Sequence, residues 1–411
     1  MDIQKIKDIY NQTSDRIKSV HIGCFEGIAE PLFLISDTYP GVWLEHVYDA
    51  VFYAKHYPEY TDIAVNTLNL FIDRQTREGQ LPCYVMNSAK CSARTAYTGF
   101  TQIQECVSFG RLCHEVCEMK KDNVFLEKCY NSIKRWDEWL RKYRMTTGRG
   151  LVEMFVGFDT GHDNSGRLDG IKFHGLRTED GFRLPAHIPP ADDPACPILA
   201  VDMNCNFYGT QTALADMARM LGKNEEAAEW DKKAHAVKEK IFELLYDKED
   251  AFFYDVDKNG NKRKFRSSTI FHLFIEKVLD KDADREIIDE IYDRHINNPD
   301  EFRTPYPFPA MAINDPSCEN HAPQNCWGYY SQGLIALRCT RWMDHYGWSK
   351  DFDMLCEKWV QAWTDCFDGL KMGQELDPIT GKPTKCSQWY SSCMLFYTYA
   401  VKRLGLIKEE L

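Results

Sequence analysis

Residues 200–245 read AVDMNCNFYGTQTALADMARMLGKNEEAAEWDKKAHAVKEKIFELL, and this stretch decides the fold. Apolar residues recur at spacings of three and four through residues 200–221 and again through residues 225–245. That spacing places them on one face of an α-helix. Because only residues 222–224 separate the two runs, the stretch predicts two consecutive helices joined by a short turn.

The same helical spacing returns along the whole chain. It predicts further helices near residues 3–20, 43–56, 63–74, 100–119, 125–143, 268–279, 283–295, 327–346, 352–367 and 387–404. Together these make about a dozen helices in about six consecutive pairs. Each pair can bury its apolar face only against its neighbours, so we predict an all-α fold closed into an (α/α)6 barrel. An open superhelix is the alternative, which the lack of a short-period sequence repeat weakens.

We expect one catalytic domain over residues 1–411. Two segments interrupt the helical pattern, at residues 147–197 and 297–323, and both are rich in Gly, Pro, Asp and aromatic residues. Long loops inside a compact domain usually carry function, so residues 157–198 are predicted to form an active-site or lid loop. Strand-like alternation is confined to short pieces such as residues 251–256, where the turn-forming Asn259-Gly260 predicts a small β-hairpin.

Composition limits the classes of function. The 411 residues are 44% hydrophobic and 27% charged, with a net charge of −12, which argues against nucleic acid or anionic membrane as a partner. No stretch approaches the roughly 18 uninterrupted apolar residues of a membrane span, and the start MDIQKIKDIYNQ lacks the apolar core of a signal peptide. We therefore expect a cytoplasmic protein, with its oligomeric state open. The 16 cysteines are scattered without a Cys-x-x-Cys pair, so we expect reduced core residues and neither a metal nor a cofactor.

Two acidic loops lie far apart in the sequence. GFDTGHDNSGRLDG, residues 157–170, carries Asp159, Asp163 and Asp169, and FDGLKMGQELDPITGKP, residues 367–383, carries Glu375 and Asp377. In a closed barrel the loops at one end converge on the mouth of the axial cavity. Paired carboxylates beside aromatic rings are what glycosidic cleavage requires. Asp-rich loops also serve as ordinary turns and caps, so this pattern alone leaves both interpretations open.

Several segments, in one order, resemble a known family. They are WLEHVYDAVFYAKHYPE (43–59), QTREGQLP (75–82), KRWDEWLRKYR (134–144), GHDNSGR (161–167), VDMNCNFYGTQTALADMARMLGKNEEAAEW (201–230), LLYDKEDAFFYDVD (244–257), GQELDPITGKP (373–383) and CSQW (386–389). This series is similar to the (α/α)6 catalytic domain of glycoside hydrolase family 63, with the closest likeness to the short mannosylglycerate and glucosylglycerate hydrolases. The resemblance runs from about Trp43 to the end of the chain.

The resemblance implies an inverting hydrolase of α-linked glucosides or mannosides, acting on a small molecule or a short oligosaccharide. It implies that Asp163 is the general acid and Glu375 the general base. Asp49 stands at the family's sugar-binding aspartate, with Tyr48 where tryptophan is usual. Further substrate-lining residues predicted at the mouth are Trp43, Gln104, His162, Arg167, Trp327 and Trp389.

The substrate and two rival functions stay open. Residues 319–334, ENHAPQNCWGYYSQGL, depart from the family's usual Gly-Pro and Trp element, which leaves the sugar and the aglycone undecided. The loop cations Arg167, Lys172, Arg177 and Arg183 would suit an anionic aglycone such as glycerate, or they simply solvate a surface loop. One rival is a sugar isomerase or epimerase on the same barrel, which would show two inward-facing histidines. The other is a non-catalytic carbohydrate-binding protein.

Overall fold

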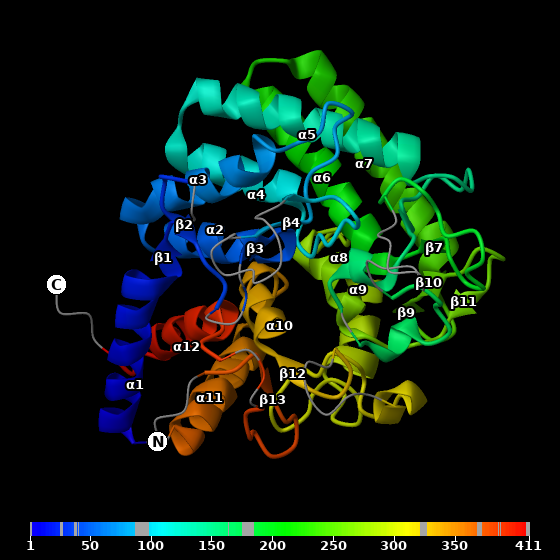
Figure 1. Ribbon diagram of the computed structural model, residues 1–411. Helices are drawn as coiled ribbons and strands as arrows, with labels where there is room; N and C mark the ends of the chain where they lie inside the picture. Colours follow the sequence, from blue (N-terminus) through cyan, green and yellow to red (C-terminus); the bar gives the residue numbers. More distant parts are fainter. Residues whose placement is uncertain are drawn as a thin grey trace.

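The computed structural model describes residues 2–24, 28–36, 39, 41–86, 98–162, 164–174, 185–320, 327–367, 372–384, 386 and 388–407, with the backbone alone for 319–320. Twelve α-helices within these residues form two concentric rings (Figure 1). The inner ring consists of the even-numbered helices: α2 (Val47–His56), α4 (Phe109–Lys120), α6 (Val201–Met220), α8 (His272–Ile275), α10 (Gly333–Arg338) and α12 (Ser391–Arg403). The outer ring consists of the odd-numbered helices: α1 (Ile3–Arg16), α3 (Thr61–Ile72), α5 (Asn123–Tyr143), α7 (Asn224–Leu245), α9 (Arg285–Ile291) and α11 (Ser349–Cys366).

The inner ring is closed. Along it α2 contacts α4, α4 contacts α6, and α6 contacts α8. On the other side α10 contacts α12, and α12 contacts α2. The gap between α8 and α10 is bridged by the 3₁₀ turn Cys339–Arg341, which follows α10 directly and contacts α8. The predicted (α/α)6 barrel is thus confirmed, and the open superhelix is wrong.

Local sequence explains where several helices begin. The Asp122 carboxylate accepts the backbone N–H groups of Val124 and Phe125 at the start of α5, and the Ser108 hydroxyl accepts the N–H of Arg111 at the start of α4. Such side chains replace the hydrogen bonds that the first turn of a helix lacks. Helix α4 ends at Lys121, whose φ of 54° leaves the helical region. Caps of this kind set the helix boundaries through contacts between residues that are close in sequence.

Short antiparallel strands decorate the loops between the helices. The sheets are β1 (Ile22–Gly23) with β2 (Leu32–Phe33); β3 (Gly41–Trp43), β4 (Tyr84–Met86) and β5 (Thr98–Gly99); β6 (Glu153–Met154), β7 (Ile198–Leu199), β10 (Asp255–Val256) and β11 (Lys262–Arg263); β8 (Tyr246–Asp247) with β9 (Phe252–Phe253); and β12 (Ser331–Gln332) with β13 (Glu375–Leu376). The predicted hairpin is confirmed: Asp255 pairs with Arg263 across a turn in which Gly260 has a φ of 88°.

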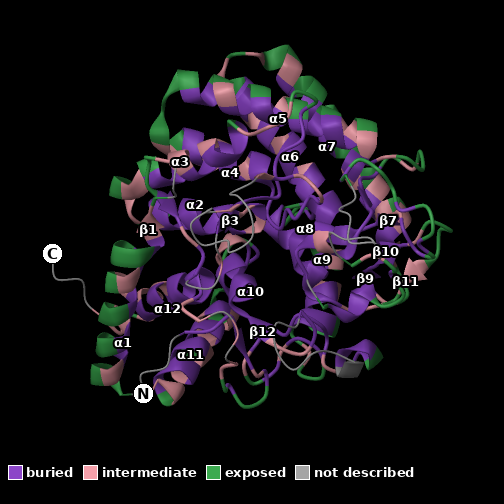
Figure 2. Cartoon of the chain, viewed as in Figure 1, coloured by how far each residue is buried: buried purple, intermediate pink, exposed green. Residues whose placement is uncertain are grey.

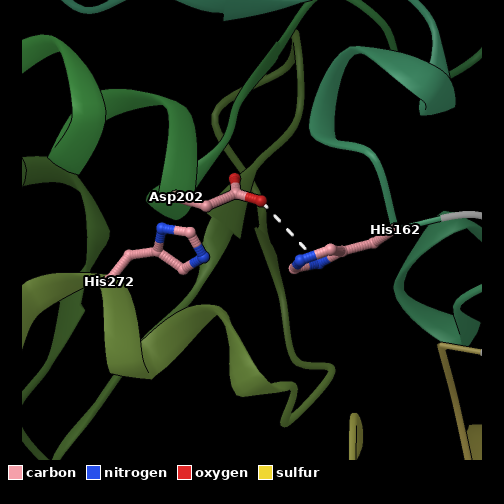
Figure 3. Close-up of side chains that lie close together, drawn as sticks. All are labelled: His162, Asp202 and His272. Carbon is pink, nitrogen blue, oxygen red and sulfur yellow. Dashed lines mark ion pairs between the residues drawn. The ribbon is translucent and has the colours of Figure 1, made fainter. Parts of the chain in front are cut away.

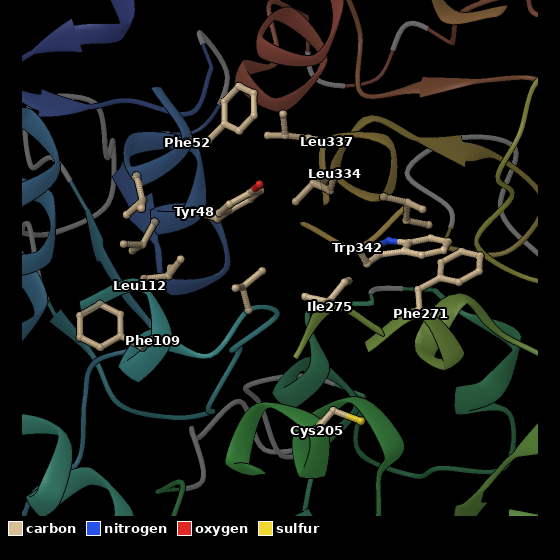
Figure 4. Packing of buried hydrophobic residues seen from close by; sticks show 14 of the residues in the cluster. Tyr48, Phe52, Phe109, Leu112, Cys205, Phe271, Ile275, Leu334, Leu337 and Trp342 are labelled. Atoms are coloured by element: carbon tan, nitrogen blue, oxygen red, sulfur yellow. The ribbon is translucent and has the colours of Figure 1, made fainter. Parts of the chain in front are cut away.

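The core fills the barrel and the space between the rings. The inner helices are almost wholly buried, whereas the exposed residues lie on the outward faces of helices such as α1, α5 and α7 (Figure 2). Tyr48, Ile275 and Leu334 come from three different inner helices and face the space that these helices enclose (Figure 4). Phe109 of α4 points the other way and packs against Phe71 of the outer helix α3, with ring centroids 6.0 Å apart. None of the described helices combines the length and the apolar character needed to cross a lipid bilayer.

Four helices start later than predicted, and α10 also ends earlier, at Arg338 and not at residue 346. Helices α2, α4, α10 and α12 begin four to nine residues later than residues 43, 100, 327 and 387. The residues before α4 and α10 are mostly buried and lie in irregular or extended backbone that includes β12, whereas the 3₁₀ turn Leu44–His46 precedes α2. Apolar spacing alone overextends these helices, because buried rings at the end of the barrel continue the same pattern in an extended backbone.

Candidate active site

The side chains of the candidate site gather where inner helices begin. His46 directly precedes α2, Asp202 lies in the first turn of α6, and His272 is the first residue of α8. Gln332 directly precedes α10, and Tyr390 directly precedes α12. These helices run in the same direction along the barrel, so their starts meet at one end. The loops that join outer to inner helices therefore supply this end with side chains.

Glu375 lies in β13 and is completely buried, with 0% exposure. Strand β13 pairs with β12 so that Glu375 faces Gln332 across the ladder. The Gln332 amide donates to Oε1 at 3.2 Å, and the Thr384 hydroxyl donates to Oε2 at 2.9 Å. Both carboxylate oxygens are thus held by side-chain donors, which fixes the direction in which the carboxylate points.

A second cluster joins His162, Asp202 and His272 (Figure 3). The His162 Nδ1 atom lies 3.9 Å from Asp202 Oδ2, and the two imidazole rings are 6.1 Å apart between centroids. Trp327 stacks on His162 with a centroid distance of 4.3 Å and an angle of 17°. The structure therefore brings three predicted residues, His162, Trp327 and Arg167, to one place, where Asp202 and His272 join them.

Arg167 holds this cluster together. It donates to both Asp202 oxygens, at 2.7 and 3.1 Å, and its Nε donates to Asp255 at 3.0 Å. Burial alone would raise the pKa of Asp202, but the charge and the hydrogen bonds of Arg167 lower it. Donor atoms of His162, Asp202 and His272 lie within 4.8 Å of one another, as a metal would need. Because Arg167 already occupies both Asp202 oxygens, this cluster is better suited to an ion pair than to a metal.

The two histidines of the cluster are neutral bases. Burial lowers the pKa of His272 to about 3, and burial also lowers the pKa of His162 well below its ordinary value. Arg167 Nη1 lies 3.3 Å from His162 Nδ1, which a neutral imidazole can accept as a hydrogen bond. The charge of Arg338 further lowers the pKa of both histidines. Each ring is therefore uncharged at neutral pH and can accept a hydrogen bond at its unprotonated nitrogen.

Aromatic side chains surround His46. The Tyr390 hydroxyl contacts His46 Nε2, and Tyr39 packs near both rings with centroid distances of 6.3 and 6.1 Å. Trp43, a predicted lining residue, meets Tyr39 edge to face at 5.2 Å. Trp389 adjoins Tyr390 in sequence, has a φ of 55°, and lies under the Arg16 guanidinium at 4.7 Å. Trp43 thus belongs to the aromatic group around His46, whereas Trp389 contacts Arg16 at the end of α1.

Glu45 lies beside the GHDN loop. Gly161 has a φ of 69°, and a Cβ at this position would collide with the Glu45 carboxylate and the Cys106 thiol. Cys106 also contacts the Glu45 carboxylate at 3.5 Å. Only glycine lets the chain turn here and approach Glu45 so closely. Residue 161 therefore brings the start of the GHDN segment against the partly buried carboxylate of Glu45, whose side chain is 11% exposed.

Three predicted residues lie apart from these groups. Gln104 is buried, with a φ of 56°, and its side chain accepts a hydrogen bond from Gln102. The Tyr48 hydroxyl lies 2.7 Å from that of Thr340, in the wall of a different cavity. Asp49 accepts the hydroxyl groups of Ser391 and Ser392 on α12. The structure thus gives Asp49 partners that tie α2 to α12.

The predicted acid Asp163 lies outside the described residues, as do Arg177 and Arg183 of the predicted loop 157–198. Arg167, in the same loop, is buried in the ion pairs described above, whereas Lys172 is exposed.

Sequence reasoning missed Glu45, Asp202, His272, Gln332 and Arg338. Arg338 is 2% exposed, and its Nη2 atom has no hydrogen-bond partner. Asp202 stands in the VDMN segment that carries the family likeness, which could have marked it. His272 lies in STIFHLF, a run with no signal beyond helical spacing. These side chains meet only because separate helices start at the same end.

Asp49 offers a test of its role through pH. Burial raises the pKa of Asp49 to about 6, against the opposing hydrogen bonds of Ser391 and Ser392. Because the folded state then holds a proton that the unfolded state has lost, the parent gains stability below pH 4 and loses it as pH rises through 6. Relative to Asp49→Asn, the parent should lose up to about 3 kcal/mol between pH 4 and pH 7.

Urea unfolding of both proteins at pH 4 and pH 7 measures this difference, with the exposed Asp8→Asn as a control. A difference that stays constant with pH would contradict the prediction. A large rise of KM in Asp49→Asn at unchanged stability would instead favour a sugar-binding role.

The chain matches the family described as "Mannosylglycerate hydrolase MGH1-like glycoside hydrolase domain" over residues 48–330. Its fold is similar to a GH63 mannosylglycerate hydrolase from Thermus thermophilus in complex with glucose, at 15% identity, covering 95% of this chain and 100% of that chain, with a TM-score of 0.71.

The fold is also similar to neutral trehalase Nth1 from Saccharomyces cerevisiae, at 14% identity, covering 92% of this chain and 74% of that chain, with a TM-score of 0.67. An uncharacterized protein from Borreliella burgdorferi is 24% identical over 146 residues, which span 36% of this chain and 29% of that protein. The family match covers well over half of the chain, so this protein belongs to the MGH1-like glycoside hydrolases and has their (α/α)6 fold.

Proposed function

We propose that this glycoside hydrolase cleaves a small α-linked glucoside or mannoside with inversion, using Asp163 as general acid and Glu375 as general base. The observation that carries the proposal is the buried Glu375 carboxylate, held at both oxygens by Gln332 and Thr384. A general base must be ionised and aimed at one water molecule. Two neutral donors on an otherwise enclosed carboxylate suit that task.

The general acid needs an environment that keeps its carboxyl group protonated, which is the opposite of what the general base needs. A carboxylic acid stays protonated near neutral pH where burial or a nearby carboxylate disfavours its charge. Asp163 directly follows His162, which is buried against Trp327, and Gly161 lies against Glu45. These neighbours support Asp163 as the proton donor to the leaving oxygen. Inversion would require a separation of about 6.5–9.5 Å between its carboxyl group and that of Glu375, with the attacking water between Glu375 and the anomeric carbon.

Proton NMR of the anomeric signals tests the proposal. The protein is mixed with α-glucosides, α-mannosides and their glycerate conjugates, and spectra are followed from the first minutes. We expect the β-anomer to appear first, and Asp163→Asn to release little or none. Early release of the α-anomer would contradict inversion, and near-normal turnover by Asp163→Asn would remove its role as the acid.

One observation favours a second candidate, a sugar isomerase or epimerase. The rings of His162 and His272 lie 6.1 Å apart between centroids, and such a pair of histidines could move a proton between neighbouring carbons of a free sugar. The same spectra distinguish it: conversion of a free aldose to a ketose or an epimer, with no glycoside cleaved, would replace the hydrolase proposal. Binding of a sugar without any turnover would favour a carbohydrate-binding protein.

A further inference from the structure

A cavity of about 270 Å³ lies among the inner helices α2, α4, α8 and the turn after α10. Several of its lining residues stand at the ends of inner helices whose starts build the candidate active site. Lys55 and His56 close α2, Ile275 closes α8, and Thr340 and Arg341 follow α10. Neither Glu375 nor the cluster of His162, Asp202 and His272 lines this cavity.

Cations outnumber carboxylates in this cavity. Its walls include Lys55, Arg111, Lys277 and Arg341 against two carboxylates, Glu115 and Glu276, in a chain whose net charge is −12. Arg341 pairs with Glu115 at 2.8 Å. Arg111 pairs with an aspartate outside the cavity, at 3.1 Å.

The two lysines of the cavity wall differ from its two arginines in their lack of an ion pair among the described residues. Lys55 and Lys277 are exposed to the cavity mouth and form no ion pair with any residue that the structure describes. Burial, and then the charges of Arg111 and Arg341, lower the pKa of Lys277, as expected where positive charge is in excess. Such a local excess attracts an anion even on a protein of negative net charge.

Arg341 has a buried donor without an acceptor among the described residues, which also indicates a site for an anion. The Arg341 side chain is 9% exposed, and its Nε atom has no hydrogen-bond partner. The Arg341 guanidinium is held over the ring of Tyr48 at 5.1 Å, so its orientation is fixed. An oriented arginine with a donor to spare is suited to an oxyanion.

The remaining wall is aromatic. Phe52 meets Tyr399 edge to face, with ring centroids 5.8 Å apart, and meets Tyr48 at 6.0 Å. These rings line the same cavity as the lysines. A ligand here would place a small apolar or planar group against the rings and its charge against the cations.

We propose that this cavity is a binding site for a small phosphate-bearing molecule, with the phosphate held by Lys55, Lys277 and Arg341. A tetrahedral dianion with several acceptor oxygens can serve donors that come from three separate elements, which a single carboxylate serves less well. The site is independent of the proposed hydrolysis, because none of the three cations belongs to the candidate active site. The opposing explanation is that these cations only neutralise the negative C-terminal ends of α2 and α8.

Isothermal titration calorimetry of the full-length protein tests the proposal, with phenyl phosphate, inorganic phosphate and benzoate as probes. We expect phenyl phosphate to bind with a Kd of about 1 mM or below, and benzoate to bind at least about tenfold more weakly. Inorganic phosphate binding as tightly as phenyl phosphate would support the site and identify free phosphate as its ligand.

Charge-reversal variants locate the binding. Lys55→Glu combined with Lys277→Glu changes two exposed side chains, and it should weaken phenyl phosphate at least about tenfold. Lys281→Glu, an exposed lysine outside the cavity wall, is the matched control and should stay within about twofold of the parent. Absence of phosphate binding up to about 10 mM, or equal binding by the double variant, would overturn the proposal and favour neutralisation of the helix ends.

Discussion

Replacement of Glu375 by glutamine is expected to lower kcat by about a thousandfold or more, because an amide cannot accept the proton of the attacking water. The fold should persist, since the glutamine side chain keeps nearly the same volume in a site that is already fully buried. Steady-state rates on the glycoside found by NMR, together with thermal unfolding of the variant, measure both effects. A loss of less than about tenfold in kcat would remove Glu375 from the role of base.

Asp377 supplies the matched control two residues along the same loop. Its carboxylate accepts the N–H groups of Ile379 and Thr380 and so shapes the turn that follows β13. Asp377→Asn keeps one acceptor oxygen, and we expect its kcat to remain within a few-fold of the parent. Equal losses in the two variants would indicate that disruption of the loop, and not loss of a base, explains the effect of Glu375→Gln.

Arg167→Met is expected to lower the free energy of unfolding by about 3–5 kcal/mol. Methionine fills part of the space but leaves Asp202 and Asp255 buried without their cation, and both carboxylates are desolvated. Urea unfolding at neutral pH measures the loss. The exposed Arg219→Ala, which breaks pairs with Asp216 and Asp231, should cost less than about 1 kcal/mol.

Compensating changes separate an ion-pair role from a substrate contact. Adding Asp202→Asn and Asp255→Asn to Arg167→Met removes the uncompensated charges and should recover part of the lost stability. If Arg167→Met unfolds like the parent but raises KM strongly, Arg167 contacts substrate and the network does not depend on it for stability.

Much of the fold was predictable because it depends on local pattern. Residues 224–245 form α7 almost where apolar spacing places a helix, and Asp122 caps α5 through neighbouring N–H groups alone. The ring arrangement also follows from pattern, since paired amphipathic helices have few ways to bury their faces. The starts of α4 and α10 were misplaced because the mostly buried residues before them continue the apolar spacing in irregular or extended backbone.

The candidate site was predictable only in part. The family likeness marks Glu375 in its Glu-Leu-Asp-Pro segment and His162 in GHDN, because those segments are short and contiguous. It gives no sign that Arg167 pairs with Asp202 and Asp255, or that His272 joins His162 from a distant part of the chain. These partners belong to separate elements of the fold, and no pattern near one of them in the sequence encodes the other.

Local sequence sets the helices, their pairing and the loop that carries Glu375, because hydrophobic spacing and capping act between residues near each other in the chain. Which side chains those residues contact depends on the tertiary structure. Asp49 reaches Ser392 across 343 residues, and Gln332 reaches Glu375 across 43. The direction of each inner helix is set by its packing against the next. Closure of the ring therefore brings the helix starts together at one end of the barrel, and it brings cations at the helix ends together around the cavity.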